Sequence, residues 1–137
     1  MTKKELLEKY RPLFYPESIA IIGASHNPQK RSNLWMKRLI ECGFKGKLYP
    51  VGAGNEPIYG RKVYNRVDKI PSTIDYANVF ISRESLPAFI EGLPAGKIRF
   101  ISFFTAGFSE SGDSRGIELE QFLLDRTNFR VSFHFGG

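Results

Sequence analysis

The loop that follows the first apolar run of the chain has the composition of an anion-binding segment. It starts at Gly23 and Ala24 and ends with the basic pair Lys30 and Arg31, where a helix is predicted to begin. The first amides of a helix lack intrahelical partners and carry partial positive charge, so they attract phosphate groups. Small residues in the loop let a ligand come close to the backbone. The segment therefore predicts a site for a phosphate-bearing small molecule.

The glycine pattern of this loop does not by itself identify the ligand. Gly23 is the only glycine of a GxGxxG pattern, since Ser25 and His26 do not supply the remaining ones, and an ordinary tight turn stays an alternative. A nicotinamide dinucleotide site usually has an acidic residue at the end of the second strand, where this chain has Val51, Gly52 and Ala53. The pattern therefore disfavours a dehydrogenase, and the absence of GKS or GKT disfavours a P-loop hydrolase.

Alternating strands and helices are the elements that would bring this loop to the edge of a sheet. The apolar runs are continuous rather than alternating, which is typical of parallel strands covered on both faces. They predict an α/β, Rossmann-like parallel sheet of about five strands with helices on both faces. Ligands of such sheets bind at the edge where the strands end. The strands are expected at 18–25, 47–51, 76–82, 98–104 and 129–135, with a small edge strand at 61–64.

Capping residues predict where the helices begin and end. The first crossover helix is expected to be capped by Ser32 and stopped by Gly43, and the second to run from Ser85 to Gly96. A third is expected after the Gly112–Ser114 turn. Its inward side chains would be Leu119, Phe122 and Leu123.

The first residues form a separate amphipathic stretch. Leu6, Leu7 and Tyr10 lie on one stripe of a short helix, which Pro12 is expected to end. We therefore expect residues 1–12 to be a helical arm that packs against the domain.

The length of 137 residues predicts one domain spanning 1–137. The start of the chain carries charges where an export signal needs an apolar segment, and no stretch is long enough to cross a bilayer. We therefore expect a cytoplasmic protein with no membrane contact. One cysteine and two histidines exclude an internal disulfide and disfavour a metal site.

The charge balance points to an anionic partner. There are 20 Lys and Arg residues against 14 Asp and Glu residues, a formal charge of +6. The basic residues are scattered along the chain, and no aromatic and basic recognition motif accompanies them. The sequence therefore favours a small phosphate-bearing ligand over nucleic acid.

Three motifs in this order resemble a known family. The segments 13–25, 43–51 and 105–110 are similar to the N-terminal CoA-binding domain of NDP-forming acyl-CoA synthetases, relatives of the succinyl-CoA synthetase α subunit. The similarity extends over about residues 12–131. It implies a Rossmann-like domain that binds CoA or acyl-CoA. It also implies a fragment of a larger multidomain protein, with further synthetase domains or subunits as partners.

The resemblance also implies which residues meet the ligand. CoA phosphates would meet the loop after the first strand and the start of the next helix, at Gly23, Ala24, Ser25, Lys30, Arg31, Ser32 and Asn33. The nucleotide and the pantetheine arm would be bordered by Val51, Gly52, Ser82 and Arg83. The cleft would be closed by Thr105, Ala106 and Gly107. All of these positions follow a predicted strand, so the physical argument and the resemblance indicate the same edge.

The chain departs from the family pattern at several of these positions. Ser32 stands where the family has Gly, Gly52 and Ala53 stand where it has Asn-Pro, and Ser82 stands where it has Pro. The segment 133–136 replaces a Gly-Pro-Asn-Cys passage. The alternative is therefore a ligand-sensing or protein-interaction module that kept the fold and lost CoA binding.

No catalytic residue is expected in this chain. The family's ligase reaction passes phosphate through a histidine of a later domain, and neither His26 nor His134 matches it. The resemblance thus implies a parent acid–thiol ligase whose CoA-binding domain is inactive alone. The aromatic residues are expected in the core, with Phe103 and Phe104 as the pair nearest the ligand edge.

Overall fold

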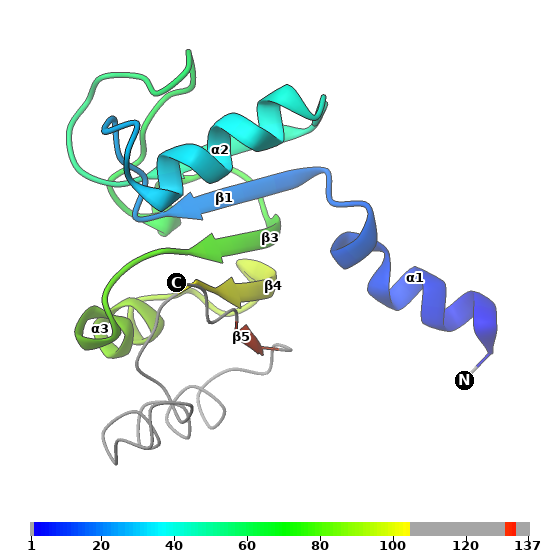
Figure 1. Cartoon of the computed structure of the whole chain (residues 1–137). Helices are drawn as coiled ribbons and strands as arrows, with labels where there is room; N and C mark the ends of the chain where they lie inside the picture. Colours follow the sequence, from blue (N-terminus) through cyan, green and yellow to red (C-terminus); the bar gives the residue numbers. More distant parts are fainter. Residues whose placement is uncertain (1, 105–130, 134–137) are drawn as a thin grey trace.

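The structure, a computed structural model, describes residues 2–104 and the short strand 131–133. Five parallel strands form one sheet in the order β2-β1-β3-β4-β5 (Figure 1). The α/β class with a parallel sheet of about five strands is confirmed. The strands are β1 Ser18–Ile22, β2 Lys47–Val51, β3 Ile74–Val79, β4 Ile98–Phe103 and β5 Val131–Phe133. The helices are α1 Lys3–Phe14, α2 Arg31–Glu41 and α3 Leu86–Glu91, and the short 3₁₀ helices are η1 Val67–Lys69 and η2 Arg83–Ser85.

The strand order places a topological switch between β1 and β3. The chain passes from β1 to its neighbour on one side, β2, and then returns to its neighbour on the other side, β3. The register brings the strand ends level, because Ile22 pairs with both Val51 and Val79, and Val79 pairs with Phe103. The loops after four strands therefore leave the sheet at one edge, which is where ligands of open α/β sheets bind.

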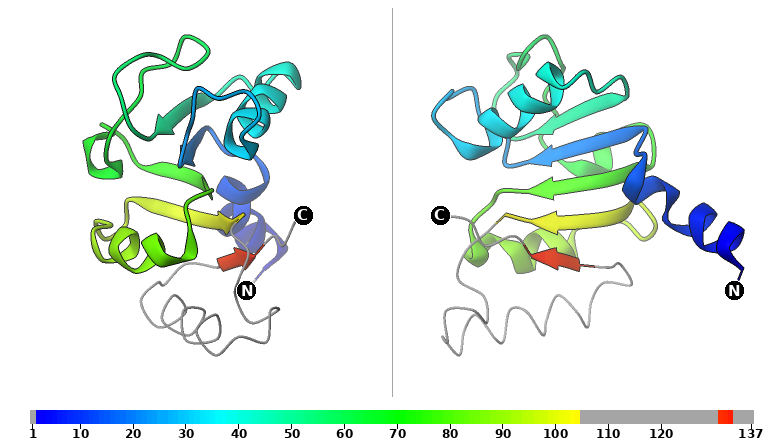
Figure 2. Two further views of the ribbon diagram at one scale, coloured as in Figure 1. Left: turned by 60° about the vertical axis from the view of Figure 1, so that its left-hand side comes forward. Right: turned by 45° about the vertical axis from the view of Figure 1, so that its right-hand side comes forward.

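The helices α2 and α3 cover opposite faces of the sheet (Figure 2). On one face Met36 of α2 packs with Ile19 and Ile21 of β1. On the other face Leu86 and Ile90 of α3 pack against the central strands, together with the segment that contains η1. All five residues of β1 are buried, which explains why its sequence is apolar without alternation.

The observed strand boundaries agree with the sequence patterns for some strands and differ from them for others. The predicted range of β2 is confirmed, and β5 lies within its predicted range. The expected end of β1 at Ser25 is wrong, because the backbone turns at Gly23, with a φ of +89°. The strand β3 begins at Ile74 and ends at Val79 rather than spanning 76–82, and β4 ends one residue before Phe104.

The small edge strand predicted at 61–64 is also wrong. This segment makes only isolated bridges, from Arg61 to Ile58 and from Tyr64 to Val51. It is a loop that returns across the edge of β2. The helix predicted around Leu119, Phe122 and Leu123 lies outside the described residues.

The helix ends are set by backbone geometry rather than by the predicted side-chain caps. Lys30 is the N-cap residue of α2 and makes no side-chain cap bond, so the prediction of Ser32 as the cap is wrong. Ser32 is buried in the first turn instead. Gly43 has a φ of +84° and confirms the predicted stop. The helix α3 is capped by Gly92, not Gly96, because Pro94 follows closely and cannot continue it.

The N-terminal helix α1 extends away from the amino ends of the strands (Figure 1). Pro12 lies inside it, so the expected end at that residue is wrong. The proline is in the last turn, where the helix needs to continue for only two more residues. Leu6 and Leu7 are exposed, and the ring of Tyr10 lies 6.1 Å from the ring of Phe100. The arm therefore packs through Tyr10 and leaves Leu6 and Leu7 exposed.

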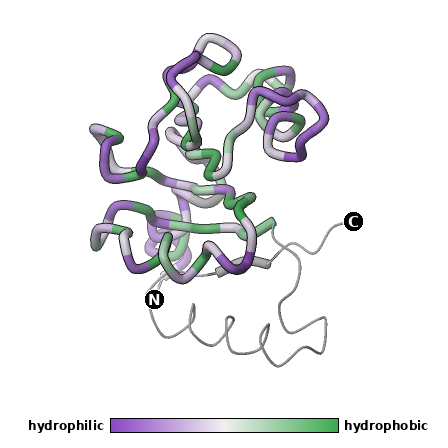
Figure 3. Tube along the Cα trace, turned by 90° about the vertical axis from the view of Figure 1, so that its left-hand side faces the viewer, coloured by the Kyte–Doolittle hydropathy of each residue, from purple (hydrophilic) through white to green (hydrophobic). Residues whose placement is uncertain are grey.

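The distribution of hydropathy distinguishes the sheet from its loops. Figure 3 faces the edge at which the strands end, and the loop between β1 and α2 is largely hydrophilic there. Within the described part of the chain, none of the helices has the length and apolar character needed to cross a membrane.

Candidate functional site

Gly23 is the backbone pivot at the edge of the sheet. Its amide and that of Ala24 both donate to the carbonyl of Val51, each at 2.9 Å. A side chain at Gly23 would need a left-handed backbone, and its Cβ would lie 3.2 Å from the carbonyl carbon of Phe80. The loop after β1 is therefore held between the ends of β2 and β3.

Gly52, which follows β2, packs against the backbone of the loop after β1. A Cβ at this position would lie 2.5 Å from the carbonyl oxygen of Ala24, closer than real Cβ contacts allow. The Gly52 amide donates to Tyr64 O at 2.9 Å. Three chain segments thus meet backbone to backbone at the end of β2.

The loop between β1 and α2 is fixed largely by its own polar groups. The amide of Asn27 donates to Ser25 Oγ at 3.1 Å, and the amide of Gln29 donates to Asn27 Oδ1 at 3.0 Å. The ring nitrogen Nε2 of His26 lies 2.9 Å from Glu56 O. The Ser25 hydroxyl therefore stabilises the turn, although the resemblance implied a phosphate contact.

The first turn of α2 is tied to this loop through Asn33. Its Nδ2 donates to Ser25 O at 2.8 Å, and its Oδ1 accepts from Tyr59 Oη at 2.6 Å. Asn33 is 3% exposed, so its side chain is a structural clamp. It holds the helix N-terminus beside Gly23, which leaves the backbone amides of the first turn as the anion-binding groups.

A first cavity, of about 400 Å³, lies at this helix N-terminus. Lys30 is exposed at its border, while the Arg31 guanidinium donates from Nη2 to Phe104 O at 2.6 Å. We call it the basic cavity. Its lining includes the predicted residues Gly23, Ser25, Lys30, Arg31 and Ser32.

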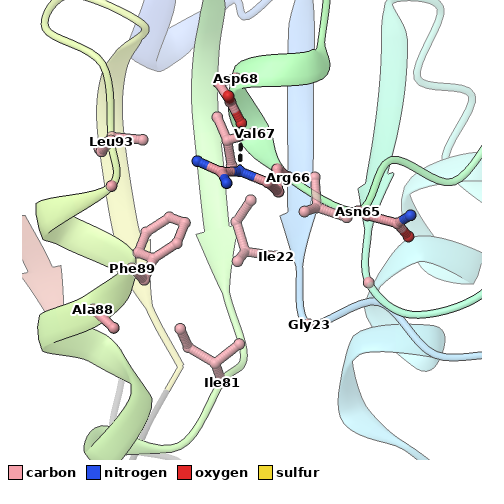
Figure 4. Close-up of a pocket in the computed structure, with 13 residues that line it drawn as sticks. Ile22, Gly23, Asn65, Arg66, Val67, Asp68, Ile81, Ala88, Phe89 and Leu93 are labelled. Carbon is pink, nitrogen blue, oxygen red and sulfur yellow. Dashed lines mark hydrogen bonds and ion pairs between the residues drawn. The ribbon is translucent and has the colours of Figure 1, made fainter.

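A second cavity, of about 470 Å³, also borders Gly23 and lies beside α3 (Figure 4). We call it the apolar cavity. Its rim carries the polar side chains of Asn65, Arg66 and Asp68. Its walls are formed mainly by Ile22, Val51, Val67, Ile81, Phe89 and Leu93.

The rim of the apolar cavity contains an ion pair. Arg66 Nε lies 3.0 Å from Asp68 Oδ1, and Figure 4 shows the guanidinium reaching toward α3. The side-chain nitrogen of Asn65, in the amide orientation that satisfies its neighbours, donates to Gly52 O at 2.9 Å. Sequence reasoning missed these rim residues. The only signal was the polar cluster between the second and third predicted strands.

The structure brings together some of the predicted site residues but not all of them. Val51 and Gly52 line the apolar cavity, and Gly23 lines both cavities. Ser82 is the N-cap residue of η2 and Arg83 is its first residue, and neither lines a cavity. Ser82 Oγ lies 3.0 Å from Ser85 Oγ. Ala24 acts through its backbone. The predicted residues Thr105, Ala106 and Gly107 lie outside the described residues.

The aromatic pair at the end of β4 is divided between core and edge. Phe103 is fully buried, so the expectation that it approaches the ligand edge is wrong. The ring of Phe104 stacks on that of Phe80, with 4.8 Å between centroids, and lies 5.1 Å from the Trp35 ring. These rings form one wall beside the basic cavity, which Phe80 lines.

Acid–base or metal chemistry finds little support in the described residues. They contain no group of three or more His, Cys, Asp or Glu side chains placed to hold a metal ion. The ring of His26 contacts a backbone carbonyl rather than a carboxylate.

The strand order and the two cavities define a doubly wound α/β domain with cavities at its topological switch. The CoA binding domain family matches residues 17–122, and the chain belongs to this family. The resemblance stated from its motifs is therefore confirmed.

Two of the similar proteins are larger ligases. The ADP-forming acetate–CoA ligase I subunit alpha of Pyrococcus furiosus is 38% identical over 117 residues, which are 82% of this chain and 25% of that protein. The ADP-forming 4-hydroxybutyrate–CoA ligase of Nitrosopumilus maritimus is 34% identical over 116 residues, which are 83% of this chain and 16% of that protein.

A solved structure shows the same architecture. The dinucleotide forming acetyl-coenzyme A synthetase 1 of Ca. Korarchaeum cryptofilum, in complex with phosphate and ADP, superposes with a TM-score of 0.82 at 31% identity. The match covers 89% of this chain and 26% of that one. The chain thus spans about a quarter or less of these relatives.

The contact between Gly52 and Ala24 generates a stability prediction. Gly52→Ala should lower the free energy of unfolding by about 1–3 kcal/mol, because the new methyl group meets a backbone oxygen that cannot move alone. Chemical denaturation measures the change. Gly92→Ala is the control, since its φ of −82° suits any residue and its Cβ would lie 3.4 Å from the nearest atom. Equal stability of the two variants would contradict the close approach.

Proposed function

We propose that this chain binds CoA, as the CoA-binding domain of an ADP-forming acyl-CoA synthetase. One observation carries the proposal: a basic cavity at a helix N-terminus and an apolar cavity lie on either side of Gly23. The nucleotide end of CoA has the matching chemistry, a diphosphate joined to an adenosine. Membership of the CoA binding domain family supports this ligand.

The diphosphate would lie against Gly23 and the first turn of α2. Backbone amides there supply hydrogen bonds and a partial positive charge, and Lys30 supplies a full charge. Because Asn33 and Ser25 already hold the loop in place, little ordering is needed when the ligand binds.

The adenine ring would occupy the apolar cavity. Aliphatic and aromatic walls suit a flat, weakly polar ring, and Gly52 lets the ribose pass close to the backbone. At the end of β2, Gly52 is followed by Ala53 rather than by an acidic residue. A site of this kind does not favour the ribose diol of a nicotinamide dinucleotide.

Ligation itself would belong to other parts of a larger protein. The relatives are named for different acids, acetate and 4-hydroxybutyrate, while their matched regions are similar to the same 137-residue chain. A CoA-binding domain common to ligases of different acids does not choose the acid. The proposed parent is an acid–thiol ligase that acts in the cytoplasm, with its nucleotide and acyl sites in further domains or subunits.

The charge at the basic cavity is tested by a double variant. Lys30→Ala/Arg31→Ala should weaken CoA binding by about a hundredfold or more in isothermal titration, because two charge-assisted contacts to phosphate are lost and each contributes about 1.5–3 kcal/mol. Lys30→Ala alone should show part of this loss, and it leaves the Arg31 bond to Phe104 O intact.

The matched control lies further along the same helix. Lys37→Ala/Arg38→Ala removes the same two charges from exposed positions of α2 that line neither cavity, and it should change CoA affinity by less than about twofold. Equal losses in both double variants would indicate a general charge effect. No heat from the unmodified chain would favour the alternative of a module that has lost CoA.

Nicotinamide dinucleotide should compete poorly. NAD should displace a labelled CoA only at concentrations well above that of unlabelled CoA, because β2 is followed by Gly52 and Ala53 rather than by a ribose-binding carboxylate. A competition titration with NAD and CoA in parallel measures the ratio. Displacement by NAD at an equal or lower concentration would refute the argument.

The purified chain should not form acyl-CoA from an acid, CoA and a nucleotide triphosphate. The His26 ring contacts a backbone carbonyl, and neither His26 nor His134 matches the phosphoryl-carrying histidine that the resemblance implies in a later domain. Nucleotide consumption and thioester formation are measured together, with and without candidate partner domains. Turnover by the chain alone that is lost in His26→Ala or His134→Ala would contradict the prediction.

A further inference from the structure

We propose that Arg66 recognises the 3′-phosphate of CoA, so that the chain distinguishes CoA from nucleotides that lack this group. The inference rests on the proposed function, because it assumes that adenosine occupies the apolar cavity. It goes beyond the proposed function by assigning ligand specificity to Arg66, a residue of the connection between β2 and β3 that the sequence analysis did not single out.

Arg66 is placed for this role by the rim of the cavity. Among the described residues that line the apolar cavity, it is the only one with a positive charge. Its side chain is 66% exposed, so a ligand can reach it without unfolding the loop. Figure 4 shows its guanidinium at the mouth of the cavity, on the side that faces Phe89 of α3.

The ion pair with Asp68 orients the guanidinium. Asp68 Oδ1 contacts Nε at 3.0 Å, and η1, which contains Asp68, begins directly after Arg66. A guanidinium has further donors on its two terminal nitrogens, and their planar fork matches two oxygens of a phosphate. Asp68 therefore fixes the plane of the group while its outer edge stays available to a ligand.

The covalent structure of CoA requires two separated cationic sites, and the chain provides two. The diphosphate is attached to the 5′ carbon of the ribose and would extend over Gly23 toward Lys30 in the basic cavity. The 3′-phosphate is attached to the neighbouring ring carbon, on the opposite face of the ribose from the 5′ carbon, and would lie at the rim near Arg66. Gly23, which lines both cavities, lies between the two sites.

The absence of an acidic residue directly after β2, at Gly52 and Ala53, is also consistent with CoA as the ligand. An acidic residue at that position holds a free ribose diol in dinucleotide sites. In CoA the 3′ hydroxyl is esterified, so no free diol exists and a carboxylate would repel the phosphate. A neutral Ala53, together with the edge of the Arg66 guanidinium that faces away from Asp68, suits a 3′-phosphorylated ribose.

The test compares CoA with dephospho-CoA by isothermal titration of the full 137-residue chain. The unmodified chain should bind CoA about tenfold more tightly than dephospho-CoA, the scale of one charge-assisted contact at an exposed site. In Arg66→Gln this ratio should fall to near one, with dephospho-CoA affinity unchanged. Arg66→Lys should keep part of the ratio, because it retains the charge and loses the fork.

The matched control is Arg99→Gln. Arg99 is also exposed and also pairs through Nε with an aspartate, Asp75, but it lies on β4 beyond the two cavities. Its substitution should leave the ratio unchanged. Equal loss of both ligands in Arg66→Gln, or an unchanged ratio, would overturn the assignment to Arg66 while the proposed function stands. Absence of binding to either ligand by the unmodified chain would overturn both.

Discussion

The close backbone contact between the ends of β1 and β2 is the constraint on which the site depends. Gly23 and Ala24 share the Val51 carbonyl, and Gly52 has no room for a side chain against Ala24 O. This contact is available only because the parallel register brings the strand ends level. It fixes the turn after β1, and that turn directs the chain into α2. The two cavities on either side of Gly23 are consequences of this one packing arrangement.

Because of that constraint, some polar side chains stabilise the loop and others remain exposed at the cavities. A loop held by its backbone still has polar groups that need partners, and Ser25 and Asn33 satisfy them inside the loop. These bonds hold the loop in shape before a ligand arrives. The cations at the rims, Lys30 and Arg66, are exposed instead. Preorganised amides with exposed charges form a site that loses little conformational freedom on binding.

The sequence predicted the features that depend on residues close in the chain, and it missed the features that depend on contacts between residues far apart in the chain. The bounds of β2 and the stop at Gly43 follow from local composition, and both were confirmed. The end of β1 depends on β2, thirty residues away in the chain, so apolar character alone placed it three residues too late. The apolar cavity combines residues from β1, the 65–68 segment and α3. No single stretch of sequence contains that combination, which is why Arg66 was missed.

In the proposed function, the strongest contacts lie at the end of CoA that does not react. The thiol is remote from the adenosine, so contacts made in these cavities cannot stabilise the bond-forming atoms directly. They can instead offset the cost of holding the thiol in place for a site elsewhere in the protein. A domain with this task needs a rigid nucleotide site and no catalytic group, which fits a fixed Gly23 turn beside a His26 that binds only a carbonyl. Ligases of different acids could then share the domain, because the part of CoA that it binds is the same in every thioester.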